Sequence, residues 1–258
     1  MSSPWLVGRL AFGSWVRVSG VVDAEWEYLQ GYVKESTTTE LLSAFIKQGM
    51  TFVDVGANVG YFTLLAASMG ARVVAYEPTP AVYKRLRENV ELNGLQNVSL
   101  LNAAVAEKAG TLTFHQSPDD PEANSIFGEG ECIEVEAVAL DEDLSRRSIQ
   151  HVDLLKIDAE GAEPLVLAGA AKLMRSERPP VMVIEVNPYC LRNAGSSVEA
   201  LLELIKASGY RCSEIEIASY RGERVANVLA VPPGFDAATA GIALPTDAEV
   251  QSRVTAEA

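Results

Sequence analysis

The sequence predicts a doubly wound α/β fold built on a Rossmann-like sheet of seven strands. Three observations carry this prediction: a central strand, glycine turn and helix pattern, further units in the same order, and two adjacent strand-like segments near the C-terminus, which predict one antiparallel strand. The central pattern occupies 51–65, TFVDVGANVGYFTLL. Glycines let the backbone approach a ligand closely, and a helix N-terminus offers free N–H groups. We therefore expect a nucleotide-type ligand at this turn.

The composition fits one large α/β domain with an added segment, because the chain has 258 residues and 48% of them are hydrophobic. Its net charge of −14 disfavours nucleic acid as a partner, since phosphate binding needs clustered Lys and Arg. Three widely spaced cysteines fit a reducing compartment, and no apolar run approaches about 18 residues. We expect a cytoplasmic protein without a membrane span or signal peptide that acts on a neutral or cationic small molecule, with a homodimer left open.

The two ends of the chain differ in composition from the region between them. Residues 1–36 hold all three tryptophans and form an aromatic-rich extension, which covers either a bound substrate or the edge of the sheet. The predicted domain spans 37–233, and a capping box of Thr37 and Glu40 is expected to open its first helix. Residues 234–258 lack hydrophobic periodicity and are expected to form a disordered tail.

The central turn departs from the dinucleotide fingerprint G-x-G-x-x-G. Asn58 and Tyr61 stand where that fingerprint has its second and third glycines, so the pattern is D-x-G-x-N-x-G. Asp54 precedes the turn, and an acidic residue there suits a ligand with a cationic amino group better than a pyrophosphate. The next predicted strand ends in Glu77, where a carboxylate can accept both hydroxyls of a ribose. Together these residues favour S-adenosylmethionine (SAM) over an ordinary turn that binds nothing.

The units that follow supply further cofactor contacts. Proline at the first position predicts a helix from Pro80, and a third strand is expected over 98–101. In a parallel sheet, the residues after that strand, Asn102 and Ala103, would lie against the adenine ring.

The region 110–138 interrupts the alternation of strand and helix. Polar and apolar residues alternate over 111–115 and 133–138, which predicts two antiparallel strands joined by a long polar loop. A loop of that length inside a domain is usually functional or disordered, and we expect a lid that orders over bound ligand. Asn124 and Ser125 in this loop are candidates for substrate contacts, the alternative being ordinary loop polarity.

The strand and helix pattern resumes in the C-terminal half. A buried strand is expected over 152–158, and an almost wholly apolar one over 181–186 carries Glu185, as in a central parallel strand. Segments 210–217 and 225–231 read as the terminal hairpin that supplies the antiparallel strand.

Acidic residues gather at the predicted carboxyl ends of these strands, where ligands bind in open α/β sheets. Asp158 is the first candidate for a proton acceptor and Glu160 the second, although Glu160 fits equally a helix-entry turn in which it caps free N–H groups. Lys156 lies two residues before Asp158 on the same strand face, where it would hold Asp158 ionised, activate a substrate oxygen, or serve as a structural ion-pair partner. His115, at the end of the first lid strand, is a further candidate base.

Glu185 near the end of the fifth strand and Asn187 just after it are placed on the substrate side of the site. With Asp158 they are oxygen donors of the kind that Mg²⁺ accepts. Their convergence cannot be read from sequence, so no metal ligand is assigned.

Four segments resemble the FkbM family of SAM-dependent methyltransferases: VDVGANVGYFTLLA (53–66), AYEPTP (75–80), LNAAVAEKAGTLTF (101–114) and LLKIDAEGAE (154–163). The first and last at this spacing are the specific ones, and the resemblance covers about 35–232. It implies the class I methyltransferase fold and O-methylation of a hydroxyl on a small molecule such as a polyketide macrolide or a sugar.

By that resemblance SAM is the cofactor, and the residues expected to bind it are Asp54, Gly56, Asn58, Gly60 and Glu77. Ala57 in the same turn and Pro78 after Glu77 are further candidates for cofactor contacts. Asp158 is expected to face the methyl group from the fourth strand. The alternatives are an N-methyltransferase, a NAD(P)-dependent oxidoreductase on the same scaffold, and a SAM-binding module without catalysis.

Overall fold

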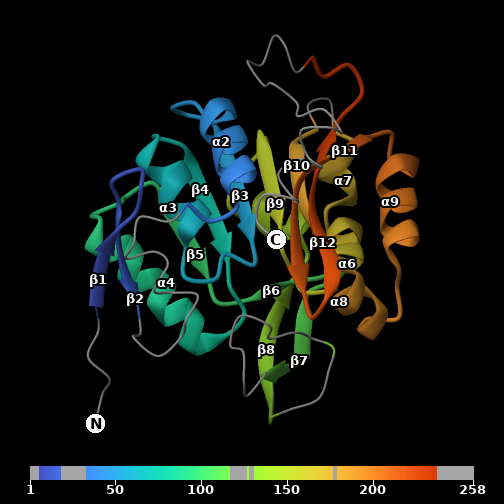
Figure 1. The fold of residues 1–258 in the computed structure, drawn as a ribbon, viewed down its shortest axis with the longest axis horizontal. Helices are drawn as coiled ribbons and strands as arrows, with labels where there is room; N and C mark the ends of the chain where they lie inside the picture. Colours follow the sequence, from blue (N-terminus) through green and yellow to red (C-terminus); the bar gives the residue numbers. More distant parts are fainter. Residues whose placement is uncertain (1–5, 19–32, 117–126, 128–130, 177–178, 237–258) are drawn as a thin grey trace.

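The computed structural model describes residues 6–18, 33–116, 127, 131–176 and 179–236. Within them, seven strands form one mixed sheet in the order β11–β12–β10–β9–β3–β4–β5 (Figure 1). β12 is antiparallel to both of its neighbours, and the other pairs are parallel. The predicted doubly wound sheet with one reversed strand is therefore confirmed. Along the chain, the strands are β3 Thr51–Val55, β4 Arg72–Tyr76, β5 Val98–Leu101, β9 Leu154–Ile157, β10 Val181–Val186, β11 Arg211–Tyr220 and β12 Glu223–Val231.

Apolar, often β-branched residues make the central strands, because both faces of a parallel sheet are covered. β10 reads VMVIEV and buries five of its six residues, and β9 buries all four. The predicted strands over 98–101 and 181–186 match β5 and β10. The strand expected over 152–158 is shorter, because β9 ends at Ile157 and Asp158 already begins a turn.

Helices cover both faces of the sheet, as Figure 1 shows, and each face has its own apolar core. The first face carries α2 Ser36–Phe45, α3 Tyr61–Ser68 and α4 Pro80–Leu92. The second carries α5 Leu140–Arg146, α6 Glu163–Gly169, α7 Ala171–Met174, α8 Pro188–Asn193 and α9 Val198–Ala207. None of the helices in the described ranges is long and apolar enough to cross a bilayer.

The capping box expected at Thr37 and Glu40 is wrong. Helix α2 begins at Ser36 and no side chain of its own N-cap residue bonds its backbone. Instead Glu216 of β11 accepts hydrogen bonds from the backbone N–H groups of Thr37 (3.3 Å) and Thr38 (2.9 Å). A carboxylate from the far edge of the sheet thus satisfies the free N–H groups that a local side chain was expected to cap.

The interruption of the α/β alternation is a small three-stranded sheet in the order β6–β8–β7. β7 (Gly110–Gln116) and β8 (Glu131–Val138) pair in antiparallel fashion, as predicted, and β8 also pairs with β6 (Ala104–Val105). Most of the loop between β7 and β8, including Asn124 and Ser125, lies outside the described residues, so the lid stays a prediction.

The described part of the N-terminal extension is a hairpin, β1 Leu6–Arg9 and β2 Trp15–Val18, which packs on α4. Asn93 at the end of α4 holds it, since its side-chain oxygen accepts the Trp15 N–H and its amide donates to the Trp15 carbonyl, both at 2.7 Å. The other two tryptophans lie outside the described residues, as do residues 237–258 of the predicted tail, and the domain boundaries stay predictions.

Candidate active site

The candidate site lies where two βα turns meet at the carboxyl ends of β3 and β9. The first turn, residues 56–60, leads from β3 into α3. Its backbone is left-handed at Gly56 (φ 78°), Asn58 (φ 50°) and Gly60 (φ 100°). A Cβ atom on Gly56 would lie 1.7 Å from the carbonyl oxygen of Asp158. Glycine is therefore required at 56 by the close approach of the second turn as well as by its own conformation.

Glu77 holds the first turn from the end of β4. Its carboxylate accepts hydrogen bonds from the backbone N–H groups of Asn58 (3.0 Å) and Thr79 (2.8 Å). Burial raises the pKa of Glu77 to about 7 against the lowering effect of these bonds. Next to it, the Asn102 amide donates to the carbonyls of Glu77 (2.9 Å) and Pro78 (2.8 Å), which ties the ends of β4 and β5 together. Asn58, Glu77 and Asn102, which were expected to contact a nucleoside, therefore lie next to one another.

Asp54 belongs to β3, just before the turn, and its side chain is buried. It is 1% exposed, and one carboxylate oxygen accepts the Thr63 hydroxyl at 2.7 Å. The other oxygen is buried without a hydrogen-bond partner among the described residues. Burial raises the pKa of Asp54, with Lys156 opposing it. A buried carboxylate with an unused oxygen is a place where a cationic group close by would be stabilised.

Lys156 and Asp158 form a buried ion pair at the end of β9. The Lys156 ammonium is 2.8 Å from a carboxylate oxygen of Asp158 and lies over the Phe62 ring, 4.9 Å from its centroid. Burial lowers the pKa of Lys156, but the carboxylates of Asp158, Glu35 and Asp54 outweigh it and raise that pKa overall. Burial pushes the pKa of Asp158 upward, but Lys156 and Lys34 hold it below its usual range. Lys156 is thus a fixed cation that keeps Asp158 ionised.

The second turn, residues 158–163, is held by Glu163, which sequence reasoning missed. One oxygen of Glu163 accepts the backbone N–H groups of Ala159 (3.0 Å) and Gly161 (3.2 Å). Burial raises the pKa of Glu163 to about 7. The capping role considered for Glu160 therefore belongs to Glu163. Its position just before Pro164 at the start of α6 was the available signal.

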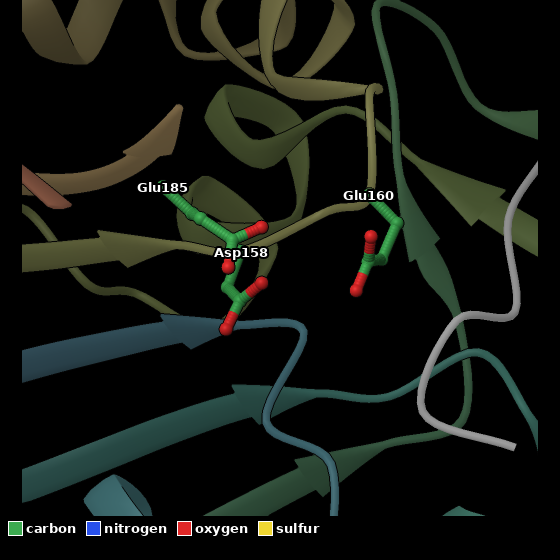
Figure 2. Close-up of side chains that lie close together, drawn as sticks. All are labelled: Asp158, Glu160 and Glu185. Carbon is green, nitrogen blue, oxygen red and sulfur yellow. The ribbon is translucent and has the colours of Figure 1, made fainter. Parts of the chain in front are cut away.

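The Glu160 carboxyl group lies near two other carboxyl groups, those of Asp158 and Glu185 (Figure 2). Oxygen atoms of Asp158, Glu160 and Glu185 lie within 4.8 Å of one another. Glu160 adopts a left-handed backbone (φ 49°) and accepts a hydrogen bond from the Cys190 thiol at 3.0 Å. Three carboxyl oxygens this close can surround a cationic group, and Lys156 already supplies one positive charge beside them.

The hydrogen bonding of Glu185 is incomplete. One of its oxygens is buried and has no hydrogen-bond partner in the described part of the chain. Burial, together with the charges of Asp158 and Glu160, raises the pKa of Glu185 well above its ordinary value. This carboxyl group therefore binds a proton more tightly than Asp158 does.

Other predicted site residues lie elsewhere or have structural roles. His115 is on β7, where its ring nitrogen is 3.4 Å from the Cys132 sulfur on the neighbouring strand. Asn187 caps α8 by accepting the Cys190 N–H at 3.3 Å. Asn124 and Ser125 fall outside the described residues. Of the predicted catalytic and substrate residues, the structure brings together Asp158, Glu160, Lys156 and Glu185.

The segment before α2 also reaches this site, which the sequence did not suggest. Glu35 is left-handed (φ 47°) and its carboxylate accepts the Asn227 amide at 2.7 Å. Its charge raises the pKa of Lys156, and Lys34 lowers that of Asp158. The N-terminal side of α2 therefore contributes to the electrostatics of the site.

The chain matches the family model described as the methyltransferase FkbM domain over residues 54–212. It is 31% identical over 186 residues to the methyltransferase sdnD of Sordaria araneosa, covering 58% of this chain and 71% of that protein. It is 25% identical over 203 residues to the 2-O-methyltransferase NoeI of Sinorhizobium fredii (69% and 82% covered). It is 29% identical over 191 residues to the 31-O-demethyl-FK506 methyltransferase FkbM of Streptomyces tacrolimicus (61% and 72% covered). The chain belongs to the FkbM methyltransferase family.

Proposed function

We propose that this methyltransferase uses SAM and transfers its methyl group to a hydroxyl of a small molecule, of polyketide-macrolide or sugar type. The observation that carries the proposal is the contact of the two turns: the glycine turn after β3 touches, at Gly56, a turn bearing carboxylates. The names of two relatives, a 2-O-methyltransferase and a 31-O-demethyl-FK506 methyltransferase, support oxygen as the acceptor atom.

The residues present fit a cationic nucleoside. Glu77 beside the glycine turn keeps lone pairs that ribose hydroxyls can use. Asn102 and Ala103 would line the adenine. The unused oxygen of Asp54 and the carboxylates beyond it suit a positive ligand and disfavour a pyrophosphate. When bound, SAM supplies an electrophilic methyl group on a positively charged sulfur.

The chain itself would then orient the acceptor and remove its proton. Alignment of acceptor oxygen and methyl carbon can supply on the order of 7–11 kcal/mol at the ideal limit. A carboxylate acting as a general base adds roughly 10²–10⁴ in rate. Asp158, Glu160 and Glu185 are the carboxyl groups available for that step, and Lys156 fixes the ionisation of the first.

Calorimetry followed by an acceptor screen tests this function. The protein should bind SAM and S-adenosylhomocysteine but not NAD(H) or NADP(H). With methyl-labelled SAM it should label members of a panel of macrolides, neutral sugars and uronic acids, and mass spectrometry should place the methyl group on oxygen. Binding of a nicotinamide nucleotide without S-adenosylhomocysteine would contradict the cofactor, and labelling confined to amines of matched amino sugars would contradict the acceptor atom.

A further inference from the structure

Asp158 and Glu185 lie side by side on neighbouring parallel strands. Ile157 of β9 pairs with Ile184 of β10, so the next residues, Asp158 and Glu185, are adjacent at the strand ends. Figure 2 shows their carboxyl groups facing each other, and Glu185 lies within hydrogen-bonding reach of Asp158. Oxygen atoms of the two groups lie within 4.8 Å of each other, and two carboxyl groups this close do not both ionise freely, which favours one shared proton.

The surroundings decide which of the two holds the proton. The Lys156 ammonium is 2.8 Å from Asp158 and stabilises the negative charge there. Lys156 acts less strongly on Glu185 than the neighbouring carboxylates do, and one oxygen of Glu185 has no hydrogen-bond partner among the described residues. These surroundings favour the negative charge on Asp158 and the proton on Glu185.

Among the described residues, the charged groups with the largest effects on Glu185 favour this distribution, with Lys156 as the exception. Asp158 and Glu160 after β9 and Glu163 at the start of α6 all oppose a negative charge on Glu185. Its neighbour on β12, Asn227, is neutral and donates to Glu35 and Thr38 instead. A positive ligand beside these groups would reverse the balance, because it stabilises the additional negative charge that ionised Glu185 brings.

We propose that the Asp158–Glu185 pair releases its shared proton when the sulfonium of SAM binds, and that ionised Glu185 then accepts the proton of the acceptor hydroxyl. This inference rests on the proposed SAM-dependent O-methylation. In the step, the acceptor oxygen forms a bond to the methyl carbon, the carbon–sulfur bond breaks with its electron pair going to sulfur, and the O–H proton passes to Glu185. The products are a methyl ether, a neutral thioether and a protonated Glu185.

Glu185 suits this role better than the other candidates. Asp158 is the weaker base, since Lys156 occupies one of its oxygens and lowers its proton affinity. Lys156 remains protonated and cannot accept a proton. A general base works best when its proton affinity matches the working pH, which a carboxyl group with a raised pKa approaches.

Proton release can be measured without knowing the acceptor. Calorimetric titrations of SAM in phosphate and in Tris, two buffers with different ionisation enthalpies, give the number of protons released on binding. We expect about one proton per SAM bound near neutral pH, and much less for S-adenosylhomocysteine, which lacks the sulfonium charge. Glu185→Gln should bind SAM without release. Glu214→Gln, on the exposed face of β11, is the matched control and should behave as wild type.

Turnover provides a second readout once the acceptor panel yields a substrate. Glu185→Gln should lower kcat by roughly 10²–10⁴-fold with little change in the Kd for SAM. Equal release with both nucleosides, release retained in Glu185→Gln, or turnover retained in that variant would overturn the proposal. If circular dichroism shows that Glu185→Gln does not fold, the wild-type comparison of the two nucleosides decides. SAM binding without proton release removes only the role of Glu185, whereas absence of SAM binding removes the proposed function as well.

Discussion

The two turns that meet at the site use carboxylates in opposite ways. The turn after β3 takes its stabilising carboxylate from the end of the neighbouring strand, where Glu77 accepts the Asn58 N–H. The turn after β9 contains its own stabilising carboxylate, Glu163, and directs another, Glu160, toward the site. In the proposed function the first turn holds the ligand, and the second turn brings carboxylates beside it. Because they touch at Gly56, a change in either turn is felt by the other.

The largest effect is expected from Gly56→Ala. The added methyl group would meet the Asp158 carbonyl at 1.7 Å, and alanine would also be strained at φ 78°. Together these should lower the free energy of unfolding by roughly 3–5 kcal/mol. Gly94→Ala is the control, because Gly94 also has a positive φ (63°) but no atom within 4 Å of an added Cβ. It should cost only about 1–2 kcal/mol. Urea denaturation that gives equal losses for the two variants would show that the turns do not press on each other.

The pH dependence of stability should reveal the two stabilising carboxylates. Burial raises the pKa of both Glu77 and Glu163 from 4.5 to about 7. The folded protein therefore holds protons that the unfolded chain has released, and the free energy of unfolding should fall as the pH rises from about 4.5 to about 7. The limit for each group is roughly 3 kcal/mol. Asp158, whose pKa is lowered, acts in the opposite sense and only in more acidic solution.

Urea titrations at a series of pH values measure this slope, and Glu77→Gln and Glu163→Gln should each reduce it. Stability that rises between pH 5 and 7 in the ligand-free protein would contradict the raised pKa values.

The substitution Glu163→Ala tests how much the second turn alone contributes to stability. It leaves the N–H groups of Ala159 and Gly161 without their acceptor in a buried turn, which should cost about 2 kcal/mol. Glu163→Gln keeps an accepting oxygen and should cost much less. Thermal and chemical denaturation of the pair measure the difference, and equal losses would mean that the charge, rather than the hydrogen bonds, holds the turn.

Local signals in the sequence were sufficient for the first turn and for the ion pair. The glycines of residues 56–60 mark a backbone that must be left-handed, and the spacing of Lys156 and Asp158 places both side chains on one face of a strand. The rule that parallel strands end at the same edge of a sheet placed Asp158 and Glu185 at that edge, whereas the close approach of their carboxyl groups came only from the structure. These features depend on residues close in sequence or on a general property of the fold.

The remaining features depend on conformations and contacts that a single sequence does not show. Two acidic residues compete for the cap of the second turn, and the left-handed backbone at Glu160 and Gly161 decides in favour of Glu163. Glu216 caps α2 from a position 178 residues away from Thr38, so no local pattern could have identified it. The position of Glu35 also depends on a contact with a residue distant in sequence, Asn227 on β12, so no local pattern could have identified it.

The smallest effect is expected when the left-handed residue of each turn, Glu160 or Asn58, is replaced by glycine. Glu160 (φ 49°) should be strained, and Glu160→Gly should raise the free energy of unfolding by about 0.5–1 kcal/mol. Asn58 (φ 50°) tolerates this conformation, and its side-chain oxygen accepts the Val59 N–H at 2.7 Å, so Asn58→Gly should bring no gain. Urea denaturation measures both changes, and a methyl-transfer assay with an acceptor from the panel measures their cost. Stability gained together with turnover lost in Glu160→Gly would show that the second turn keeps a strained carboxylate for chemistry, whereas a gain at Asn58 would place the strain in the turn that holds the ligand.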